Sequence, residues 1–173
     1  MINTKSIKIM SIVVLSLIAV SCNKNPFVVT QINCPAVAIV SNTGNLFRFA
    51  SDDRNQEDVL FSANISAINT ECLQGEGVIE TVEFNISVRR GPQLGSEEVI
   101  IPYFVALMRD NNLITAKRIY EVKVRFAQGE DFVTIRETIV QAFEEVDIAR
   151  RYDYELLVGF QLTADELAFN VLH

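Results

Sequence analysis

The sequence predicts an all-β domain, folded as an antiparallel β-sandwich of immunoglobulin-like type with about seven or eight strands. Apolar and polar residues alternate with a period of two in several segments, as they do in strands that bury one face. Turn signals built from Gly, Pro and Asn separate these segments. The chain has 173 residues, of which 49% are hydrophobic, so it can bury the core of one compact domain. A β-barrel is the alternative architecture.

Two segments, 59–68 and 78–89, show the alternation most clearly. Cys72, Gly75 and Gly77 lie between them, so we expect the two strands to form a hairpin. The side chains expected on the core face are Val59, Phe61, Ala63, Ile65, Ala67, Val78, Val82, Phe84, Ile86 and Val88.

Residues 98–108 are almost continuously apolar, which is typical of a strand that is covered on both faces. Pro102 interrupts this segment, and proline cannot donate a hydrogen bond to a strand ladder. We therefore expect a bulge at Pro102, or a point where the strand changes its partner. An Asp-Asn-Asn turn at 110–112 then leads into a strand at 114–126, which predicts a second hairpin.

The remaining strands are expected at 36–40, 46–49, 132–139 and 152–162. From Glu137 onward a helix extending to residue 148 is an alternative to the strand. After residue 162, Thr163 and Glu166 have the spacing of a capping box. We expect a single helical turn to close the domain there.

The first 21 residues have the layout of an export signal. Lys5 and Lys8 precede an apolar segment, 9–20, which is shorter than the roughly 20 apolar residues that a membrane-spanning helix needs. A small residue, Ser21, then precedes Cys22. The alternative is an ordinary secretory signal followed by an unrelated cysteine.

The sequence Ala19-Val20-Ser21-Cys22 resembles the lipobox of bacterial lipoproteins. The resemblance implies that residues 1–21 are removed and that Cys22 becomes an N-terminus linked to diacylglycerol and acylated, for example with palmitate. It also implies attachment to the cell envelope through lipid. Asn23, in place of Asp, resembles the signal of lipoproteins sorted to the outer membrane, which predicts a protein that faces the periplasm from that membrane.

Residues 22–33 are then a lipid-anchored tether, polar or extended, and residues 34–173 form the sandwich domain. Loss of Lys5 and Lys8 changes the formal charge from −7 to −9. Such an acidic domain is a poor ligand for nucleic acid, and electrostatics gives it little attraction to anionic lipid. We expect membrane contact through the lipidated end alone.

With Cys22 lipidated, Cys34 and Cys72 remain as one pair in an oxidising compartment, where a structural disulfide is expected. Closing this loop stabilises the fold by roughly 3 to 4 kcal/mol in the chain-entropy model. A redox-active thiol is the alternative, but it needs a nearby histidine or a Cys-x-x-Cys spacing, and the sequence has neither.

The sequence predicts no catalytic residue, no metal site and no cofactor. The sole histidine is the terminal His173, and no serine lies in a Gly-x-Ser-x-Gly pattern. Two acidic segments are interpreted as solvated loops, because the first lacks the glycine and the terminal glutamate of a calcium-binding EF-hand. Their residues are Asp52, Asp53, Asn55, Glu57 and Asp58 in the first, and Glu144, Glu145 and Asp147 in the second.

Segments 101–106 and 158–170 are similar to a family of uncharacterised alphaproteobacterial lipoproteins with a YFVA-type strand and a GFQLT-type C-terminal segment. The resemblance implies an envelope location and a single domain, and it assigns no activity. Core packing with a capped turn is the simpler explanation of both segments. The sharper hypothesis is that the C-terminal segment binds a partner protein through Phe160, Gln161, Leu162, Thr163, Glu166 and Phe169.

These features predict a non-enzymatic, lipid-anchored structural or interaction module of the envelope, with another envelope protein as its partner. Its working surface is expected to be the C-terminal segment or a sheet edge, where a partner can add a strand. The alternative is a module that holds a small apolar or peptidic ligand between its sheets. An enzyme would require clustered carboxylates with perturbed pKa values.

Overall fold

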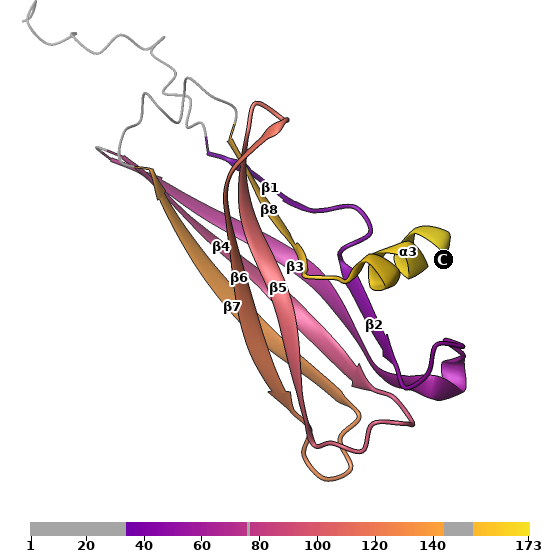
Figure 1. Ribbon diagram of the computed structural model, residues 1–173. Coiled ribbons are helices and arrows are strands. Elements are labelled where there is room, and N and C mark those ends of the chain that lie inside the picture. The colour runs from indigo at the N-terminus through magenta and orange to yellow at the C-terminus, as the bar shows by residue number, and fades with distance from the viewer. Residues whose placement is uncertain (1–33, 76, 144–153) are drawn as a thin grey trace, which may run out of the picture. The chain divides into compact units, whose positions relative to one another are not determined.

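The computed structural model describes residues 34–75, 77–143 and 154–173, and they form a two-sheet β-sandwich (Figure 1). Eight strands, one short 3-10 turn and one α-helix lie in these ranges, which confirms the predicted fold class. The elements are β1 (Ala36–Ile39), β2 (Asn45–Phe49), η2 (Gln56–Asp58), β3 (Val59–Gln74), β4 (Val78–Arg90), β5 (Glu98–Arg109), β6 (Leu113–Arg125), β7 (Phe132–Phe143), β8 (Tyr154–Phe160) and α3 (Ala164–Leu172).

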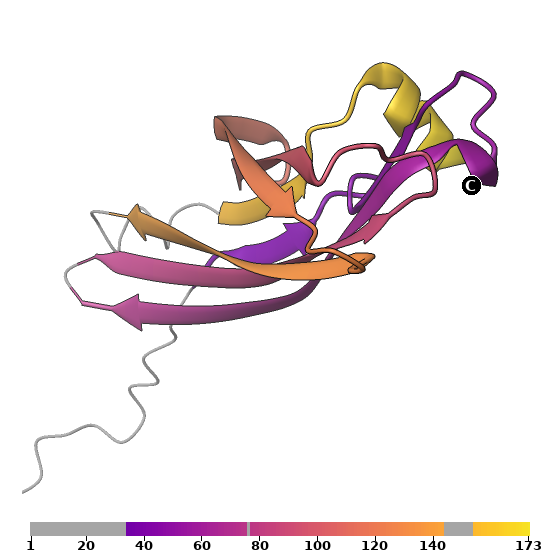
Figure 2. The same cartoon turned by 90° about the horizontal axis from the view of Figure 1, so that it is seen from below.

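The strands form two four-stranded sheets, in the orders β1-β8-β5-β6 and β2-β3-β4-β7. Neighbouring strands are antiparallel except β1 and β8, which are parallel. Figure 2 shows the two sheets as separate layers, with α3 beside β2. The architecture is that of an immunoglobulin-like sandwich, although the strands follow a different order from the ABED and CFG sheets of immunoglobulin domains.

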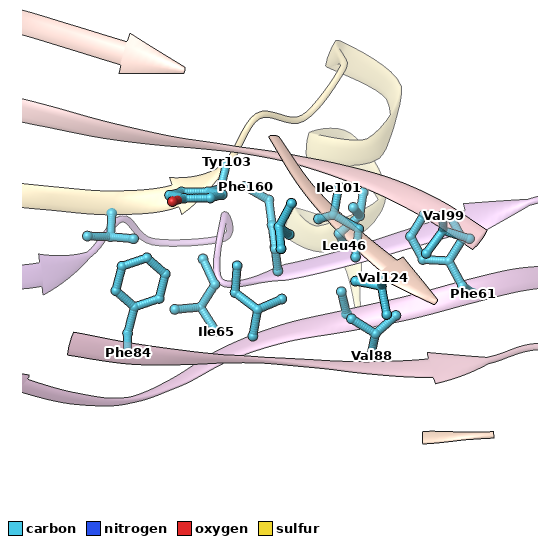
Figure 3. Close-up of a cluster of buried hydrophobic side chains, with 14 of the residues drawn as sticks. Leu46, Phe61, Ile65, Phe84, Val88, Val99, Ile101, Tyr103, Val124 and Phe160 are labelled. Atoms are coloured by element: carbon cyan, nitrogen blue, oxygen red, sulfur yellow. The ribbon is translucent and has the colours of Figure 1, made fainter. Parts of the chain in front are cut away.

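Side chains from both sheets fill the space between them (Figure 3). Phe84 of β4 contacts Tyr103 of β5 with the two rings edge to face, 5.6 Å between centroids. Burial of this apolar surface is the main source of stability of the domain. The fully buried side chains include Leu46, Phe84, Ile86, Ile101, Tyr103, Phe126, Leu156 and Phe160.

The predicted core faces of β3 and β4 are confirmed except at two positions of β3. Val59 is only partly buried, and its neighbour Leu60 packs against the core instead. Phe61, Ala63 and Ile65 are buried, but Ala67 is exposed and Ile68 packs against the core instead. Ala67 has a positive φ of 52°, and the register with β4 shifts between Ser66 and Asn69. This bulge inserts an extra residue, so the inward-facing residues are odd-numbered before it and even-numbered after it. Strand β3 also continues to residue 74 rather than ending at 68.

Pro102 lies inside β5 and pairs with Glu121 of β6 without a register shift. The bulge of β5 lies instead between Leu107 and Met108. On the other side of β5, the ladder with β8 ends at Tyr103, directly next to Pro102. Neither expectation for Pro102 is met, because no bulge lies at this residue and β5 keeps β6 as its partner on both sides of it.

Strand β7 is longer than predicted and replaces the helix that was considered from Glu137 onward. It continues to Phe143, and its inward positions alternate with exposed ones along the whole strand. Glu137 occupies one of the inward positions, where its carboxylate accepts a hydrogen bond from the hydroxyl of Tyr103. The part of the proposed helix at 144–148 lies outside the described residues.

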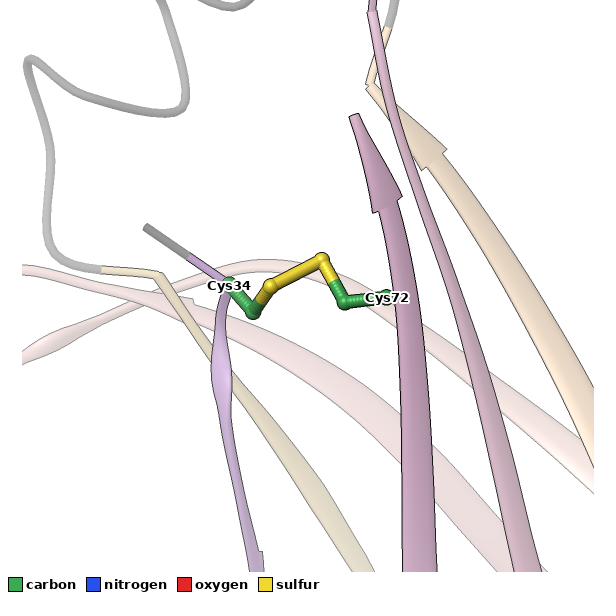
Figure 4. The surroundings of a disulfide bond; sticks show 2 residues. All are labelled: Cys34 and Cys72. Atoms are coloured by element: carbon green, nitrogen blue, oxygen red, sulfur yellow. A yellow bond between two sulfur atoms is a disulfide. The ribbon is translucent and has the colours of Figure 1, made fainter. Parts of the chain in front are cut away.

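The predicted disulfide is present and joins the two sheets near the start of the domain (Figure 4). Cys34, just before β1, is bonded to Cys72 on β3, with 6.1 Å between the Cα atoms. The bond closes a loop of 38 residues. It attaches the start of β1 to β3 at a position two residues before β3 ends at Gln74.

Candidate functional site

The structure places the predicted partner-binding segment against its own domain. Phe160, the last residue of β8, is completely buried in the core, so the prediction that it contacts a partner is wrong. Leu162 is partly buried and packs against the same core. Gln161 donates its backbone N–H to the carbonyl of Pro102 at 2.9 Å, which continues the sheet for one more residue.

Helix α3 packs on β2 through one aromatic side chain. The ring of Phe169 lies 5.6 Å from the ring of Phe47 and 5.2 Å from the ring of Phe49, in both cases edge to face. His173 stacks on the other side of Phe169 at 4.4 Å. These contacts explain why α3 has nine residues rather than the single turn that was predicted.

Polar contacts fix the same helix. Thr163 and Glu166 form the predicted capping box, in which Thr163 donates its N–H to Glu166 Oε2 at 2.7 Å. The other oxygen of Glu166 accepts a hydrogen bond from Arg48 of β2 at 3.2 Å. Asn170 donates through Nδ2 to the carbonyls of Asn42 and Asn45, at 2.8 and 2.7 Å. Thr163, Glu166 and Phe169 therefore act within the domain.

The close packing of the turn before β2 on β8 requires a glycine at position 159. Gly159 is buried in β8, and a Cβ atom at this position would lie 2.9 Å from the ring of Phe104 and collide with the hydroxyl of Thr43. Thr43 belongs to the turn that precedes β2, and its carbonyl accepts a hydrogen bond from the N–H of Phe160 at 2.8 Å. The small residue lets this turn pack closely on β8.

Strand β6 offers a surface of a different kind. It is the last strand of its sheet and pairs only with β5, so one side of its backbone has no strand neighbour in the described structure. All seven side chains of residues 113–119 are exposed, whichever face they occupy. We call residues 113–119 the free segment of β6.

The free segment extends beyond the core. From Ala116 to Arg125 the register with β5 is continuous, so even-numbered residues occupy one face throughout. Val122 and Val124 on this face are buried, whereas Ala116 and Arg118 on the same face are exposed. The opposite sheet therefore covers only the second half of β6.

The free segment is also basic, in an acidic protein. Strand β6 contains Lys117, Arg118, Lys123 and Arg125 against the single acid Glu121. Arg125 pairs with Glu98 at 2.7 Å, and Lys117 places its Nζ 4.4 Å from the centroid of the Phe104 ring. Among the described residues Arg118 and Lys123 have no ion-pair partner.

The other three sheet edges are less open. Strands β1 and β2 have only four and five residues, and α3 packs against β2. Strand β7 has 12 residues, but its inward positions are partly buried along its whole length. A long edge with two exposed faces is found, within the described ranges, only in β6.

One buried acid lies inside the sandwich. Glu80 of β4 is 1% exposed, and neither of its carboxylate oxygens has a hydrogen-bond partner. Burial raises the pKa of Glu80 to about 7. Its register neighbours are Cys72 and Gln141, which carry no charge, so this acid does not form part of a carboxylate pair.

A groove of about 490 Å³ lies between α3 and the connection from β1 to β2. Phe47, Phe169 and Asn170 line it together with Ile39 and His173. It lies outside the space between the sheets, where the alternative function would place a ligand and where core side chains form a continuous cluster.

The acidic loop at residues 51–58, before β3, is stabilised by hydrogen bonds from its own side chains. Ser51 donates to Asp58 at 2.8 Å, and Arg54 donates to the carbonyl of Asp165 at 3.0 Å. In the part of the chain that the structure describes, no group of three or more His, Cys, Asp or Glu residues could hold a metal ion.

Several sequence predictions concern residues outside the described ranges. They are the export signal at 1–21, the lipidation site Cys22 with the rest of the tether to residue 33, the acidic residues Glu144, Glu145 and Asp147, and the first two residues of the strand predicted at 152–162. Among the described helices, none is sufficiently long and apolar to cross a bilayer. Comparison with known proteins finds no matching family model, no matching curated protein and no matching solved structure.

Proposed function

We propose that the protein is a lipid-anchored, non-enzymatic interaction module of the bacterial envelope that faces the periplasm. It binds an extended segment of another envelope protein, which adds a strand to β6. The exposure of the free segment of β6 on both faces is the observation that carries this proposal. The location rests on the lipobox-like sequence that ends at Cys22.

The disulfide supports the compartment. Disulfides persist in oxidising spaces such as the bacterial periplasm and are rare in the cytosol. The bond between Cys34 and Cys72 links the start of β1 to β3, and these strands belong to different sheets.

Strand addition suits the free segment because its backbone can pair on one side while its side chains contact the partner on two faces. Lys117 and Arg118 point to opposite faces, so a partner strand with acidic residues on both faces complements them. Ile119, which is 55% exposed, offers an apolar contact on the same face as Lys117. We therefore expect an acidic partner segment with at least one apolar residue.

Photo-crosslinking in intact cells tests this proposal. A crosslinking amino acid at Ala116 or Ile119 should capture an envelope protein, whereas the same group at Ser87 should not, because Ser87 lies on a central strand. The double variant Lys117→Glu, Arg118→Glu should reduce capture at Ile119. Arg136→Glu is the matched control, since it reverses an exposed basic charge on the opposite edge strand β7.

Equal capture from Ala116 and Ser87 contradicts strand addition at β6. So does capture that is unaffected by the double charge reversal. Mass spectrometry of the purified protein tests the anchor separately, because an acylated Cys22 adds the mass of its lipid and an unprocessed Met1 does not.

The outer side of α3 is a second candidate surface. Its exposed apolar residues are Leu167, Val171 and Leu172, and none of them belongs to the predicted set. Deletion of residues 163–173 distinguishes the two surfaces, because it removes α3 and leaves β6 in place. Loss of the partner in the deleted protein favours α3, and retained capture from Ile119 favours β6.

A further inference from the structure

The outer face of the sheet β2-β3-β4-β7 changes from polar to apolar toward one end. Along most of its length this face carries residues such as Asn85, Ser87, Thr134 and Arg136. Near the β3–β4 hairpin it carries Leu73, Ile79, Val140 and Ala142 instead, and we call these four residues the apolar tip.

The strand register brings the apolar tip together. Leu73 of β3 lies directly opposite Ile79 of β4, and Ile79 lies opposite Ala142 of β7. Val140 is two residues from Ala142 on the same face of the same strand. Leu73 is 71% exposed, Val140 63% and Ile79 46%, so three neighbouring strands present large apolar side chains to solvent. Adjacent exposed apolar side chains of this kind mark interaction sites.

The apolar tip lies at the end of the sandwich where the chain enters it. Leu73 follows Cys72, and Cys72 is bonded to Cys34, the first described residue. In Figure 4 the bond joins the beginning of β1 to β3 close to its hairpin end. The tether and the apolar tip are therefore linked through a covalent bond only one residue away from Leu73.

We propose that the apolar tip rests in the surface of the lipid bilayer that holds the anchor. This inference depends on the lipidation of Cys22 that is part of the proposed function. Residues 22–33 separate the lipidated residue from Cys34, and covalent geometry limits the reach of a chain of this length to at most roughly 40 Å. The tether therefore keeps this end of the domain near the membrane, at a high effective concentration.

Apolar contact, not charge, is the chemistry of this surface. The domain is acidic, so it gains little from anionic headgroups, and the tip has no basic residue among its four. Burying apolar side chains at the boundary between headgroups and acyl chains is favourable in proportion to the apolar area removed from water. A weak contact is sufficient because the anchor already supplies the attachment.

Tryptophan fluorescence can test the contact directly, because the chain has no tryptophan. The full-length acylated variant Val140→Trp is reconstituted into vesicles of phosphatidylethanolamine and phosphatidylglycerol with brominated acyl chains, which quench nearby indole rings. Thr134→Trp is the matched control, because it lies on the same strand and the same face but in the polar half.

We expect a roughly twofold or larger loss of emission for Val140→Trp and little change for Thr134→Trp, because quenching requires contact with the acyl region. Adding Leu73→Lys to the Val140 variant should reverse much of the quenching. Equal emission of the two tryptophans in brominated and ordinary vesicles overturns the inference. A blue shift at Val140 without quenching also overturns it, and indicates that protein, such as a second copy of the chain, covers the tip.

Different results contradict the lipid anchor and the contact of the apolar tip with the bilayer. A protein whose mass shows no acyl chains and that does not float with vesicles overturns both the lipid anchor and the tip contact. An acylated protein that floats with vesicles, but whose Val140→Trp emission is unquenched, overturns the tip contact alone.

Discussion

The hydroxyl of Tyr103 on β5 donates a hydrogen bond of 2.7 Å to the carboxylate of Glu137 on β7. The two residues belong to different sheets, so this bond crosses the interior of the sandwich. Tyr103 is 1% exposed, and its ring also stacks on Tyr120 at 5.2 Å. Burial, together with the Glu137 carboxylate, raises the pKa of Tyr103 above its ordinary value, so the hydroxyl remains a donor.

Replacing Tyr103 with Phe should reduce the free energy of unfolding by about 1.5 to 3 kcal/mol, the range for a hydrogen bond to a charged group. The reason is that Glu137 loses its donor while the ring packing is unchanged. Urea unfolding measures the change. Tyr120→Phe is the control, because it removes the hydroxyl of the neighbouring ring; an equal loss in both variants contradicts a specific role for the Glu137 bond.

Removing the disulfide should destabilise the domain without changing its fold. The double variant Cys34→Ser, Cys72→Ser frees a loop of 38 residues, which costs roughly 3 to 4 kcal/mol in the chain-entropy model. Unfolding of the oxidised protein, the reduced protein and the variant gives the difference. A thiol assay of the oxidised exported protein should find no free thiol; a difference in stability below about 1 kcal/mol contradicts the prediction.

Glu80 should make stability fall as the pH rises. Burial raises the pKa of Glu80 from 4.5 to about 7, so the folded state holds a proton that the unfolded state releases. The contribution of the neutral acid is complete below pH 4.5 and is lost as the pH rises through about 7. Between pH 5 and pH 8 this amounts to roughly 2 to 3 kcal/mol.

The variant Glu80→Gln should lack this part of the pH dependence, because an amide does not titrate in this range. Glu83→Gln is the matched control on the outer face of the same strand. Denaturant unfolding at a series of pH values compares the three proteins. If the curves for the wild type and Glu80→Gln are parallel from pH 5 to pH 8, the buried acid does not control the stability.

Phe169→Ala should loosen α3 and leave the sandwich intact. The variant loses two edge-to-face contacts with β2, each worth about 0.5 to 1.5 kcal/mol beyond the burial of area. Hydrogen exchange should increase in α3 and β2 but not in β4 or β5. Leu172→Ala is the control, since Leu172 is mostly exposed; increased exchange throughout the domain contradicts a local role for Phe169.

Periodicity predicted most of the strands because one face of each packs on the core. The periodicity gave the wrong inward residue at Ala67, where a bulge shifts the inward face by one residue. The positive φ of Ala67 marks this bulge, which has no distinctive sequence signal. The periodicity was ambiguous at Glu137, because a charged residue at an inward position is unusual in a strand. Only the Tyr103 hydroxyl on the opposite sheet explains why Glu137 is accommodated there.

The candidate site was less predictable than the fold. Phe160 and Phe169 resembled exposed binding residues, but their partners lie on strands distant in sequence, and local pattern cannot identify such partners. The free segment of β6 did carry a signal. At Arg118 the position that should be apolar in a half-buried strand is charged, which predicts that the core does not extend to it.

The disulfide also determines how the domain bears mechanical load. Tension applied to the chain before Cys34 reaches the sandwich at Cys34, and the covalent bond to Cys72 transmits it to β3, which lies between β2 and β4. While the bond is intact, the short ladder between β1 and β8 does not bear that pull alone. Reduction would transfer the whole force to those few hydrogen bonds, so the oxidised protein should withstand stretching that peels β1 from the reduced one.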